Sequence, residues 1–277
     1  MRLDWRQWNS HRQRWVTALL MAAPVLAVLT VGPYWSWFLL VALLAAAGLW
    51  EYQRMVFQEG LPVKWQAFYI TAGLLLPLGA SVAGSDGLHA ALFFVFFAAF
   101  FTALAVSPED ANGLSRLARI SMGWLYIPYL LSYVLLIGRA STGNRWVFFA
   151  LLVTVANDAG AYYCGRHLGR HKLYERVSPK KTLEGSAGGL AAGMLVGSLF
   201  GLLFLETVSA GCLILLSFVL ALVGQIGDLI ESLIKRMNGV KDSSNILPGH
   251  GGILDRLDSL LFVFPVLWFF VNWINCR

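Results

Sequence analysis

The segment 225–259 holds the residues best suited to chemistry in this chain. Ten acidic, basic or imidazole side chains lie there between two long apolar runs, although only 13% of all residues are charged: Asp228, Glu231, Lys235, Arg236, Lys241, Asp242, His250, Asp255, Arg256 and Asp258. Ionisable groups beside or inside membrane-spanning segments are costly and usually functional. We therefore expect the functional site in this segment.

Asp228, Ser232 and Lys235 are predicted to share one face of a helix. Each residue of an α-helix turns by about 100°, which places Ser232 and Lys235 within about 40° of Asp228. A polar stripe that reaches water at the end of a helix is the better explanation of an isolated aspartate. Because further charged pairs follow in the same loop, we expect all three residues to be catalytic.

A glycine-rich turn, Pro-Gly-His-Gly-Gly at 248–252, leads into the last predicted helix. Backbone N–H groups exposed at the start of a helix suit a phosphate, and the helix dipole adds to the attraction. We expect Gly251 and Gly252 to bind a substrate phosphate, with His250 as a hydrogen-bond donor rather than a base.

Asp255 and Asp258 lie one turn apart where this helix is predicted to begin, on either side of Arg256. Acidic residues at a helix N-terminus can simply complement the helix dipole, which is a sufficient explanation of Asp258. Beside a glycine turn, however, two aspartates favour a site for Mg²⁺ and phosphate, because Mg²⁺ takes few carboxylates together with substrate phosphates. We predict metal ligands at Asp228, Asp255 and Asp258.

A second polar stretch, Asn-Asp-Ala-Gly-Ala-Tyr-Tyr, spans residues 157–163 at the end of a predicted helix. Asp158 and Tyr162 are four residues apart and therefore share a helix face. With Asn157 and Tyr162 beside it, Asp158 could bridge two helices or contact a metal or substrate. The spacing does not separate these alternatives.

The stretch Ser-Pro-Lys-Lys-Thr-Leu-Glu-Gly at 178–185 predicts a loop that enters a helix. Lys180 and Lys181 would face phosphate groups as cations, with Ser178 beside them. The alternative is an ordinary basic loop on the cytoplasmic side of a membrane.

The composition predicts an all-α polytopic membrane protein. Apolar residues make up 58% of the 277 residues, and the charged fraction of 13% is about half that of a soluble domain. In a membrane protein, a net charge of +6 more often sets orientation than binds nucleic acid, which we do not expect as a partner. The three cysteines have no metal-binding or CxxC spacing, so neither a zinc site nor a disulfide framework is expected.

Nine membrane-spanning helices are predicted from runs of about twenty apolar residues. They lie near 17–31, 35–50, 67–84, 90–107, 120–138, 146–164, 187–205, 208–230 and 258–275. The chain is then one integral membrane domain, in which residues 1–145 supply scaffold helices and residues 146–277 the catalytic part.

The distribution of basic residues predicts the orientation of these helices. With nine crossings, 18 of the 21 Lys and Arg residues fall on one side, and Arg139, Arg145 and Arg277 fall on the other. Basic loops stay in the cytoplasm, so the N-terminus is predicted inside and the C-terminus outside, in a membrane of the bacterial inner or plasma type. The polar loops 165–186 and 231–257 then share the cytoplasmic face.

The pattern Ser232-x2-Lys-Arg-x4-Lys-Asp-x5-Pro-x-His-Gly-Gly-x2-Asp-Arg-x-Asp258 resembles the signature of the phosphatidate cytidylyltransferases, also called CDP-diacylglycerol synthases. The stretches at 157–163 and 178–185 resemble accompanying motifs of that family, and the resemblance spans roughly residues 150–275. Nine helices also fit the fold of this family. No motif position departs from the family pattern.

The resemblance implies an enzyme that condenses CTP with phosphatidic acid and gives CDP-diacylglycerol and pyrophosphate for phospholipid synthesis. It implies Mg²⁺ as cofactor, with K⁺ as a candidate second cation. Asp228 and Asp255 match the acids associated with a two-metal centre, and Ser232 and Lys235 match the polar residues beside it. The residues expected to bind substrate are Arg236, Lys241, His250, Gly251, Gly252, Arg256, Ser178, Lys180, Lys181, Asn157, Asp158 and Tyr162.

Other functions would leave a different pattern of residues. An ion- or proton-coupled transporter would use Asp158 and Asp228 as a relay across the membrane, and a catalytically silent relative would retain the motifs without activity. A CDP-alcohol phosphotransferase would carry an aspartate-rich DGxxAR-type motif, which this sequence lacks. Membrane lipids are expected partners, and a homodimer is expected by analogy with similar membrane enzymes.

Overall fold

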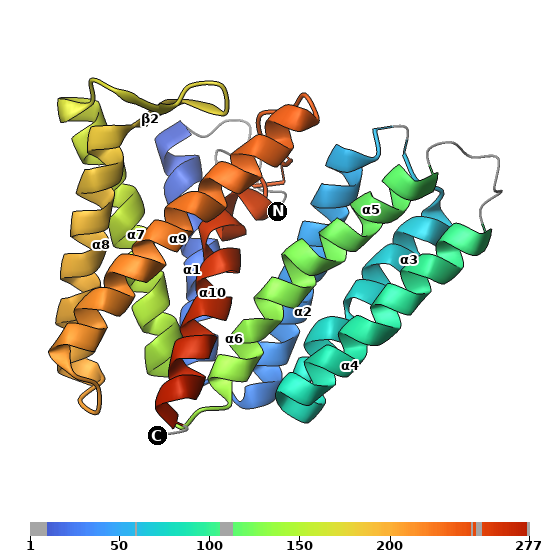
Figure 1. Ribbon diagram of the computed structural model, residues 1–277, viewed down its shortest axis with the longest axis horizontal. Coiled ribbons are helices and arrows are strands. Elements are labelled where there is room, and N and C mark those ends of the chain that lie inside the picture. Colours follow the sequence, from blue (N-terminus) through green and yellow to red (C-terminus); the bar gives the residue numbers. More distant parts are fainter. Residues whose placement is uncertain (1–9, 59, 106–112, 245, 248–250, 276–277) are drawn as a thin grey trace, which may run out of the picture. The chain divides into compact units, whose positions relative to one another are not determined.

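A computed structural model describes residues 10–58, 60–105, 113–244, 246–247 and 251–275 of the chain (Figure 1). Seven helical segments within these residues are long and apolar enough to cross a membrane, and a shorter apolar helix covers Met21–Val31. The predicted class of all-α polytopic membrane protein is therefore confirmed. The count of nine crossings stays a prediction, because one of the seven segments is twice the usual length.

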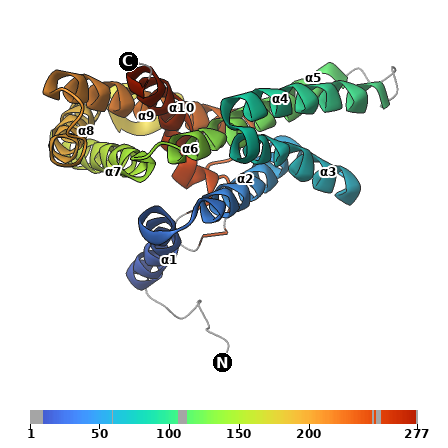
Figure 2. The ribbon, with the colours of Figure 1, turned by 90° about the horizontal axis from the view of Figure 1, so that it is seen from below.

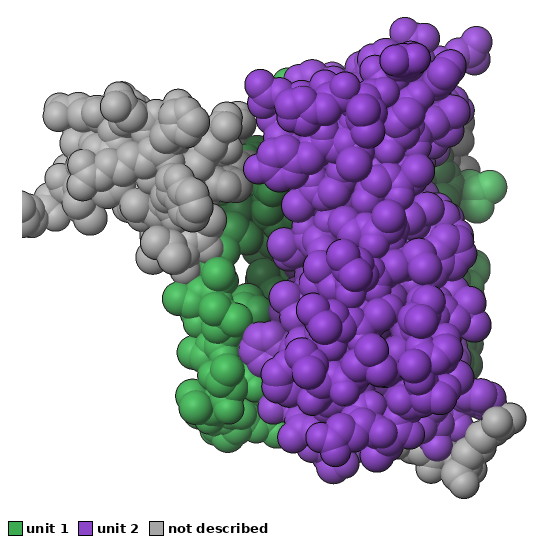
Figure 3. All heavy atoms as spheres, turned by 90° about the vertical axis from the view of Figure 1, so that its left-hand side faces the viewer, with its two compact units in different colours: residues 1–128, 240–256 green, residues 129–239, 257–277 purple. Residues whose placement is uncertain are grey.

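The chain divides into two compact units, which Figure 3 colours separately. The first unit comprises residues 1–128 and 240–256, and the second comprises residues 129–239 and 257–277. The helices of the first unit are α1 (Ser10–Val31), α2 (Tyr34–Val56), α3 (Val63–Gly73), α4 (Leu75–Ala105) and α5 (Gly113–Trp124).

The double-length segment, Val63–Phe101, has 39 residues and is interrupted inside α4. Gly84 has φ of 67°, a conformation that glycine adopts without a steric penalty, and it breaks the helix. A Cβ on Gly79 would collide with the carbonyl oxygen of Gly87, so the two arms of α4 on either side of the break lie in direct contact. The break lies at the end of the predicted helix 67–84.

The predicted helix 120–138 is observed with an interruption. A π-helical turn, η2 (Leu125–Tyr129), joins α5 to α6 (Leu130–Gly138), which belongs to the second unit. Pro128 lies inside this turn. Since proline has no N–H to donate and its ring clashes with the preceding turn, the regular hydrogen-bond pattern cannot continue through it.

The other helices of the second unit are α7 (Gly143–Leu168), α8 (Leu183–Phe204), α9 (Ala210–Met237) and α10 (Leu254–Asn275), whose first turn lies in the first unit. Compared with the prediction, α8 begins four residues earlier than 187, and α9 continues seven residues beyond 230. The longer α9 places all of its charged residues on regular helix rather than in a loop.

Glycines form a stripe along α8 that allows α7 and α9 to approach it. Gly185, Gly189, Gly193, Gly197 and Gly201 recur every four residues and are all buried. Figures 1 and 2 show α8 beside α7 and α9 in both views. Small residues at this spacing allow helix backbones to pack closely in membranes, where no hydrophobic force drives helices together.

A short hairpin connects α7 to α8. Strands β1 (Lys172–Tyr174) and β2 (Ser178–Thr182) pair antiparallel, with Lys172 opposite Thr182. The Oγ1 atom of Thr182 accepts a hydrogen bond of 3.1 Å from the N–H of Gly185, which caps the start of α8. The structure thus shows the predicted entry into a helix and adds two short strands that the sequence did not predict.

Replacing Gly193 by leucine should disturb the packing of α8. A Cβ at this position would lie 3.0 Å from the Cβ of Ala221 and 3.2 Å from the carbonyl oxygen of Val153. Overpacking of this kind costs about 1–3 kcal/mol. We expect Gly193→Leu to lower the midpoint of thermal unfolding of the detergent-solubilised protein by several degrees.

The matched control is Gly211→Ala, because a Cβ at Gly211 would meet no atom within 4 Å. Equal midpoints for Gly193→Leu and this control would contradict the packing described for α8.

Candidate active site

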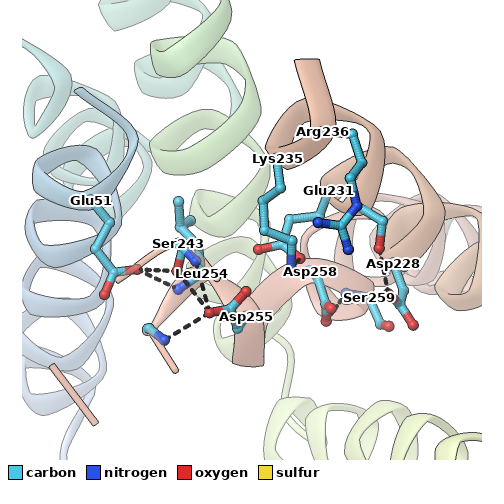
Figure 4. Close-up of polar contacts among 12 residues, drawn as sticks. Glu51, Asp228, Glu231, Lys235, Arg236, Ser243, Leu254, Asp255, Asp258 and Ser259 are labelled. Carbon is cyan, nitrogen blue, oxygen red and sulfur yellow. Dashed lines mark hydrogen bonds and ion pairs between the residues drawn. The ribbon is translucent and has the colours of Figure 1, made fainter. Parts of the chain in front are cut away.

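The C-terminal half of α9 lies directly against α10, at the residues where α10 enters the second unit. A Cβ on Gly227 would lie 2.7 Å from the carbonyl oxygen of Asp258 and 3.3 Å from the Cα of Ser259. Because glycine permits this close approach, Asp228, the next residue of α9, comes near Asp258 of α10 (Figure 4). Two of the predicted metal ligands are therefore neighbours in the second unit.

Asp228 is paired with a lysine from the hairpin. Its Oδ2 atom lies 2.5 Å from the Nζ of Lys181, and both side chains are about one-third exposed (30% and 27%). The hydroxyl of Ser232 donates to Oδ1 over 3.5 Å, the outer limit of a hydrogen bond. The predicted neighbours Asp228 and Ser232 are thus together. Lys181, predicted to face phosphates, neutralises a carboxylate in this structure.

Lys235 forms a buried ion pair one turn further along α9. Its Nζ atom donates to Oε2 of Glu231 over 2.5 Å, and the two residues are only 9% and 1% exposed. Lys235 was predicted to be catalytic, and Glu231 had no predicted role. The i,i+4 spacing of Glu231 and Lys235 on one helix was the signal that could have identified the pair.

The carboxylates of the second unit form a loose group with donor chemistry suited to Mg²⁺. Asp258 accepts a 2.7 Å hydrogen bond from the N–H of Ser259, and it interacts electrostatically with Asp228, Asp158 and Lys235. Among the described residues, no three acidic, histidine or cysteine side chains form a complete metal cage. Mg²⁺ does not need one, since it takes one or two protein carboxylates together with water and substrate phosphates.

Asn157 lies in a hydrogen-bonded bridge between three helices. Nε2 of Gln225 in α9 donates to Oδ1 of Asn157 in α7 over 2.8 Å and to the carbonyl oxygen of Ser186 in α8 over 3.0 Å. The hydroxyl of Ser186 also bonds to Oε1 of Gln225. Asn157 is 1% exposed, so the structure shows it joining helices, and its predicted contact with substrate stays a prediction.

Other predicted substrate-binding residues lie around this group in the second unit. The Tyr162 hydroxyl accepts a 3.1 Å hydrogen bond from Arg166, and Nε of Arg236 donates to the carbonyl oxygen of Val177 over 3.4 Å. Ser178 and the exposed Lys180 both lie on β2. The cations Arg166, Lys180 and Arg236 therefore lie at the same end of the second unit as Asp158 of α7 and Asp228 of α9.

Asp255, the remaining predicted metal ligand, belongs to a hydrogen-bond network in the first unit. Its Oδ2 atom accepts from the N–H of Gly252 over 2.8 Å and from both the N–H and the hydroxyl of Ser243 over 3.0 Å (Figure 4). The Gly252 N–H, predicted to bind phosphate, therefore donates to Asp255 here. Its contact with a substrate stays a prediction.

Four further residues of the loop were predicted to bind substrate: Lys241, His250, Gly251 and Arg256. Lys241 and Arg256 are exposed in the first unit, and Gly251 has a φ of 75° that favours glycine. His250 lies outside the described residues.

Glu51 of α2 also belongs to this network and was not predicted from the sequence. Its side chain is completely buried and accepts hydrogen bonds from Ser243, Ser244, Ile253 and Leu254. The first five helices were predicted to be scaffold. The available signal was an acidic residue in the last turns of an otherwise apolar helix, which is rarely accidental.

Comparison with known proteins identifies the family. The profile of the cytidylyltransferase family matches residues 12–274. The chain belongs to this family. It is 34% identical over 270 residues to the phosphatidate cytidylyltransferase of Bacillus subtilis, covering 93% of this chain and 96% of that protein.

Two staphylococcal relatives in the cytidylyltransferase family match a shorter part of the chain. The phosphatidate cytidylyltransferases of Staphylococcus saprophyticus and Staphylococcus epidermidis are 43% and 48% identical over 159 residues, covering 57% of this chain and 58% of each relative. Membership of the cytidylyltransferase family confirms the predicted resemblance and the predicted class of enzyme.

The stability of this cytidylyltransferase should fall more when one member of the buried Glu231–Lys235 pair is replaced than when both are replaced. Removing one member of a buried ion pair typically costs about 3–5 kcal/mol, whereas replacing both by neutral residues of similar size is often tolerated. We expect Glu231→Gln to lower the thermal midpoint markedly and the double variant Glu231→Gln with Lys235→Met to recover most of the loss. A double variant no more stable than Glu231→Gln alone would contradict the coupling of these residues.

Proposed function

We propose that this chain transfers the cytidylyl group of CTP to phosphatidic acid and releases pyrophosphate, which makes CDP-diacylglycerol for phospholipid synthesis. The observation that carries the proposal is membership of the cytidylyltransferase family over residues 12–274, with relatives named phosphatidate cytidylyltransferase. The carboxylates and cations grouped in the second unit supply the chemistry that such a reaction needs.

The distribution of charge along the helices suits two substrates of opposite character. No Asp, Glu, Lys or Arg lies in α8 after Glu184, in α9 before Asp228 or in α10 after Asp258. The acyl chains of phosphatidate can therefore stay beside apolar helix, while CTP binds in water at the polar end. The same distribution argues against a transporter, because a relay of ionisable groups across the membrane would need them along these helices.

The reaction is a nucleophilic displacement at phosphorus. A phosphate oxygen of phosphatidate forms a bond to the α-phosphorus of CTP, and the bond from that phosphorus to the bridging oxygen of pyrophosphate breaks. Pyrophosphate leaves with the electron pair. Because the attacking oxygen is already anionic, the protein needs no strong base, and positioning and charge neutralisation supply most of the rate enhancement.

The residues at the polar end divide between metal binding and phosphate binding. Asp228 and Asp258 of the second unit would hold Mg²⁺, which when bound neutralises charge on the phosphates of CTP, and for Asp255 of the first unit the role of a metal ligand stays a prediction. The cations would bind the triphosphate and the phosphatidate headgroup, and they are Lys180, Lys181, Lys235, Arg236, Lys241 and Arg256. Lys181 would then exchange its contact with Asp228 for a contact with substrate.

The site is proposed to face the cytoplasm, where CTP is made. The support is the basic character of the loops that carry it, since basic loops remain on the cytoplasmic side. Arg170, Lys172, Arg176, Lys180 and Lys181 lie in the connection from α7 to α8, and Arg166 lies in the last turn of α7.

The experiment that tests the proposed function measures pyrophosphate release by the purified protein in detergent micelles. We expect release that requires CTP, phosphatidate and Mg²⁺ together. In the Asp228→Asn variant we expect turnover to fall by at least about 100-fold, because loss of a charged group that acts on transferring phosphate typically costs several kcal/mol.

The matched control for this variant is Asp86→Asn, which removes an exposed aspartate near the break in α4. Asp86→Asn should retain the turnover of the unmodified protein. Full turnover in the Asp228→Asn variant would overturn the role given to Asp228, and release independent of phosphatidate would overturn the proposed reaction.

A further inference from the structure

Glu51 reaches from α2 to a loop almost two hundred residues away in the sequence. Its Oε1 atom accepts from the hydroxyl of Ser244 over 2.6 Å and from the N–H of Ile253 over 2.9 Å. Its Oε2 atom accepts from the hydroxyl of Ser243 over 3.0 Å and from the N–H of Leu254 over 2.9 Å. All five residues belong to the first unit, and Glu51 is 0% exposed.

The two backbone donors make a carboxylate necessary at this position. The N–H groups of Ile253 and Leu254 can only donate, and each lies against a different oxygen of Glu51. A glutamine in either orientation would turn its NH₂ group toward one of these N–H groups, leaving a buried donor without an acceptor. Leu254 is also the first residue of α10, where unpaired N–H groups and the helix dipole favour a negative charge.

Ser243 connects Glu51 to Asp255. The hydroxyl of Ser243 lies 3.0 Å from both Oε2 of Glu51 and Oδ2 of Asp255. A serine hydroxyl has a single proton and can donate to one of these oxygens at a time. The two carboxylates therefore hold the same side chain, and a change in the charge or length of Glu51 alters the surroundings of Asp255.

Gly252 completes the arrangement by leaving space for the carboxylate. A Cβ on this residue would lie 2.6 Å from Oε2 of Glu51 and closer still to the hydroxyl of Ser243, so any larger residue would displace both groups. The N–H of the same residue donates to Asp255 over 2.8 Å. The backbone at Gly252 is thus fixed from one side by Glu51 and from the other by Asp255.

We propose that Glu51 is a positioning residue of the cytidylyltransferase, which caps the start of α10 and fixes the orientation of Asp255 through Ser243. This proposal rests on the proposed function of the site. Groups that orient a metal-binding carboxylate typically contribute about 10–100-fold to metal affinity or activity. Glu51 touches none of the reacting atoms in this account and acts through the loop that it holds.

The test compares Glu51→Gln, Glu51→Asp and the control Glu206→Gln in full-length protein in lipid nanodiscs. Glu206 is an exposed acidic residue in the turn before α9. The kinetic measurements are kcat, KM for CTP and the Mg²⁺ concentration giving half-maximal rate. Hydrogen exchange of the amides of Ile253 and Leu254, measured without substrate or Mg²⁺, reports directly on the cap.

For Glu51→Gln we expect kcat to fall at least about tenfold and the half-saturating Mg²⁺ concentration to rise at least about tenfold. We also expect exchange of one of the two amides to accelerate at least about tenfold, since glutamine leaves that amide without its acceptor. Glu51→Asp keeps the charge and should recover part of the loss in kcat. Glu206→Gln should match the unmodified protein in every measurement.

Two results would overturn the positioning role. Unchanged exchange in Glu51→Gln would show that Glu51 does not cap α10. Faster exchange with unchanged kcat and Mg²⁺ dependence per folded protein would show that the cap is structural alone. If the unmodified protein releases no pyrophosphate, the proposed function fails and the positioning role fails with it, whereas the exchange measurement still decides whether Glu51 caps α10.

Discussion

Every buried carboxylate in this apolar chain needs a donor, and this requirement determines how the polar segments are placed. In the first unit, Glu51 is satisfied by two hydroxyls and two backbone N–H groups. In the second unit, the Oε2 atom of Glu231 accepts from the ammonium of Lys235 within the same helix. An unpaired carboxylate in either place would cost several kcal/mol, so each pairing fixes the segment that provides the donor.

Glycine controls how closely the segments that carry these groups approach one another. Gly227 permits contact between α9 and the backbone at Asp258, Gly252 leaves room for the carboxylate of Glu51, and the stripe along α8 admits α7 and α9. The polar groups and the small residues are therefore parts of one arrangement. Close backbone packing brings short side chains such as aspartate within reach of each other.

The sequence predicted the elements well because their signals are local. Apolar runs predicted the membrane helices, helical spacing placed Asp228 beside Ser232, and the motif from Ser232 to Asp258 indicated the family. Glu51 could not be paired from the sequence, because its partners lie 192–203 positions away and no spacing rule covers that separation. The contact of Lys181 with Asp228 was missed for the same reason, since it depends on how the hairpin packs on α9.

The central claim is that this membrane protein joins the α-phosphate of CTP to a lipid phosphate. The most direct measurement uses CTP radiolabelled at the α-phosphate or at the γ-phosphate, with phosphatidate in micelles and purified protein. The account predicts that α-label appears in an organic-soluble lipid and γ-label in pyrophosphate, in equal amounts. Recovery of the γ-label in the lipid, or of the α-label only in water-soluble products, would contradict it.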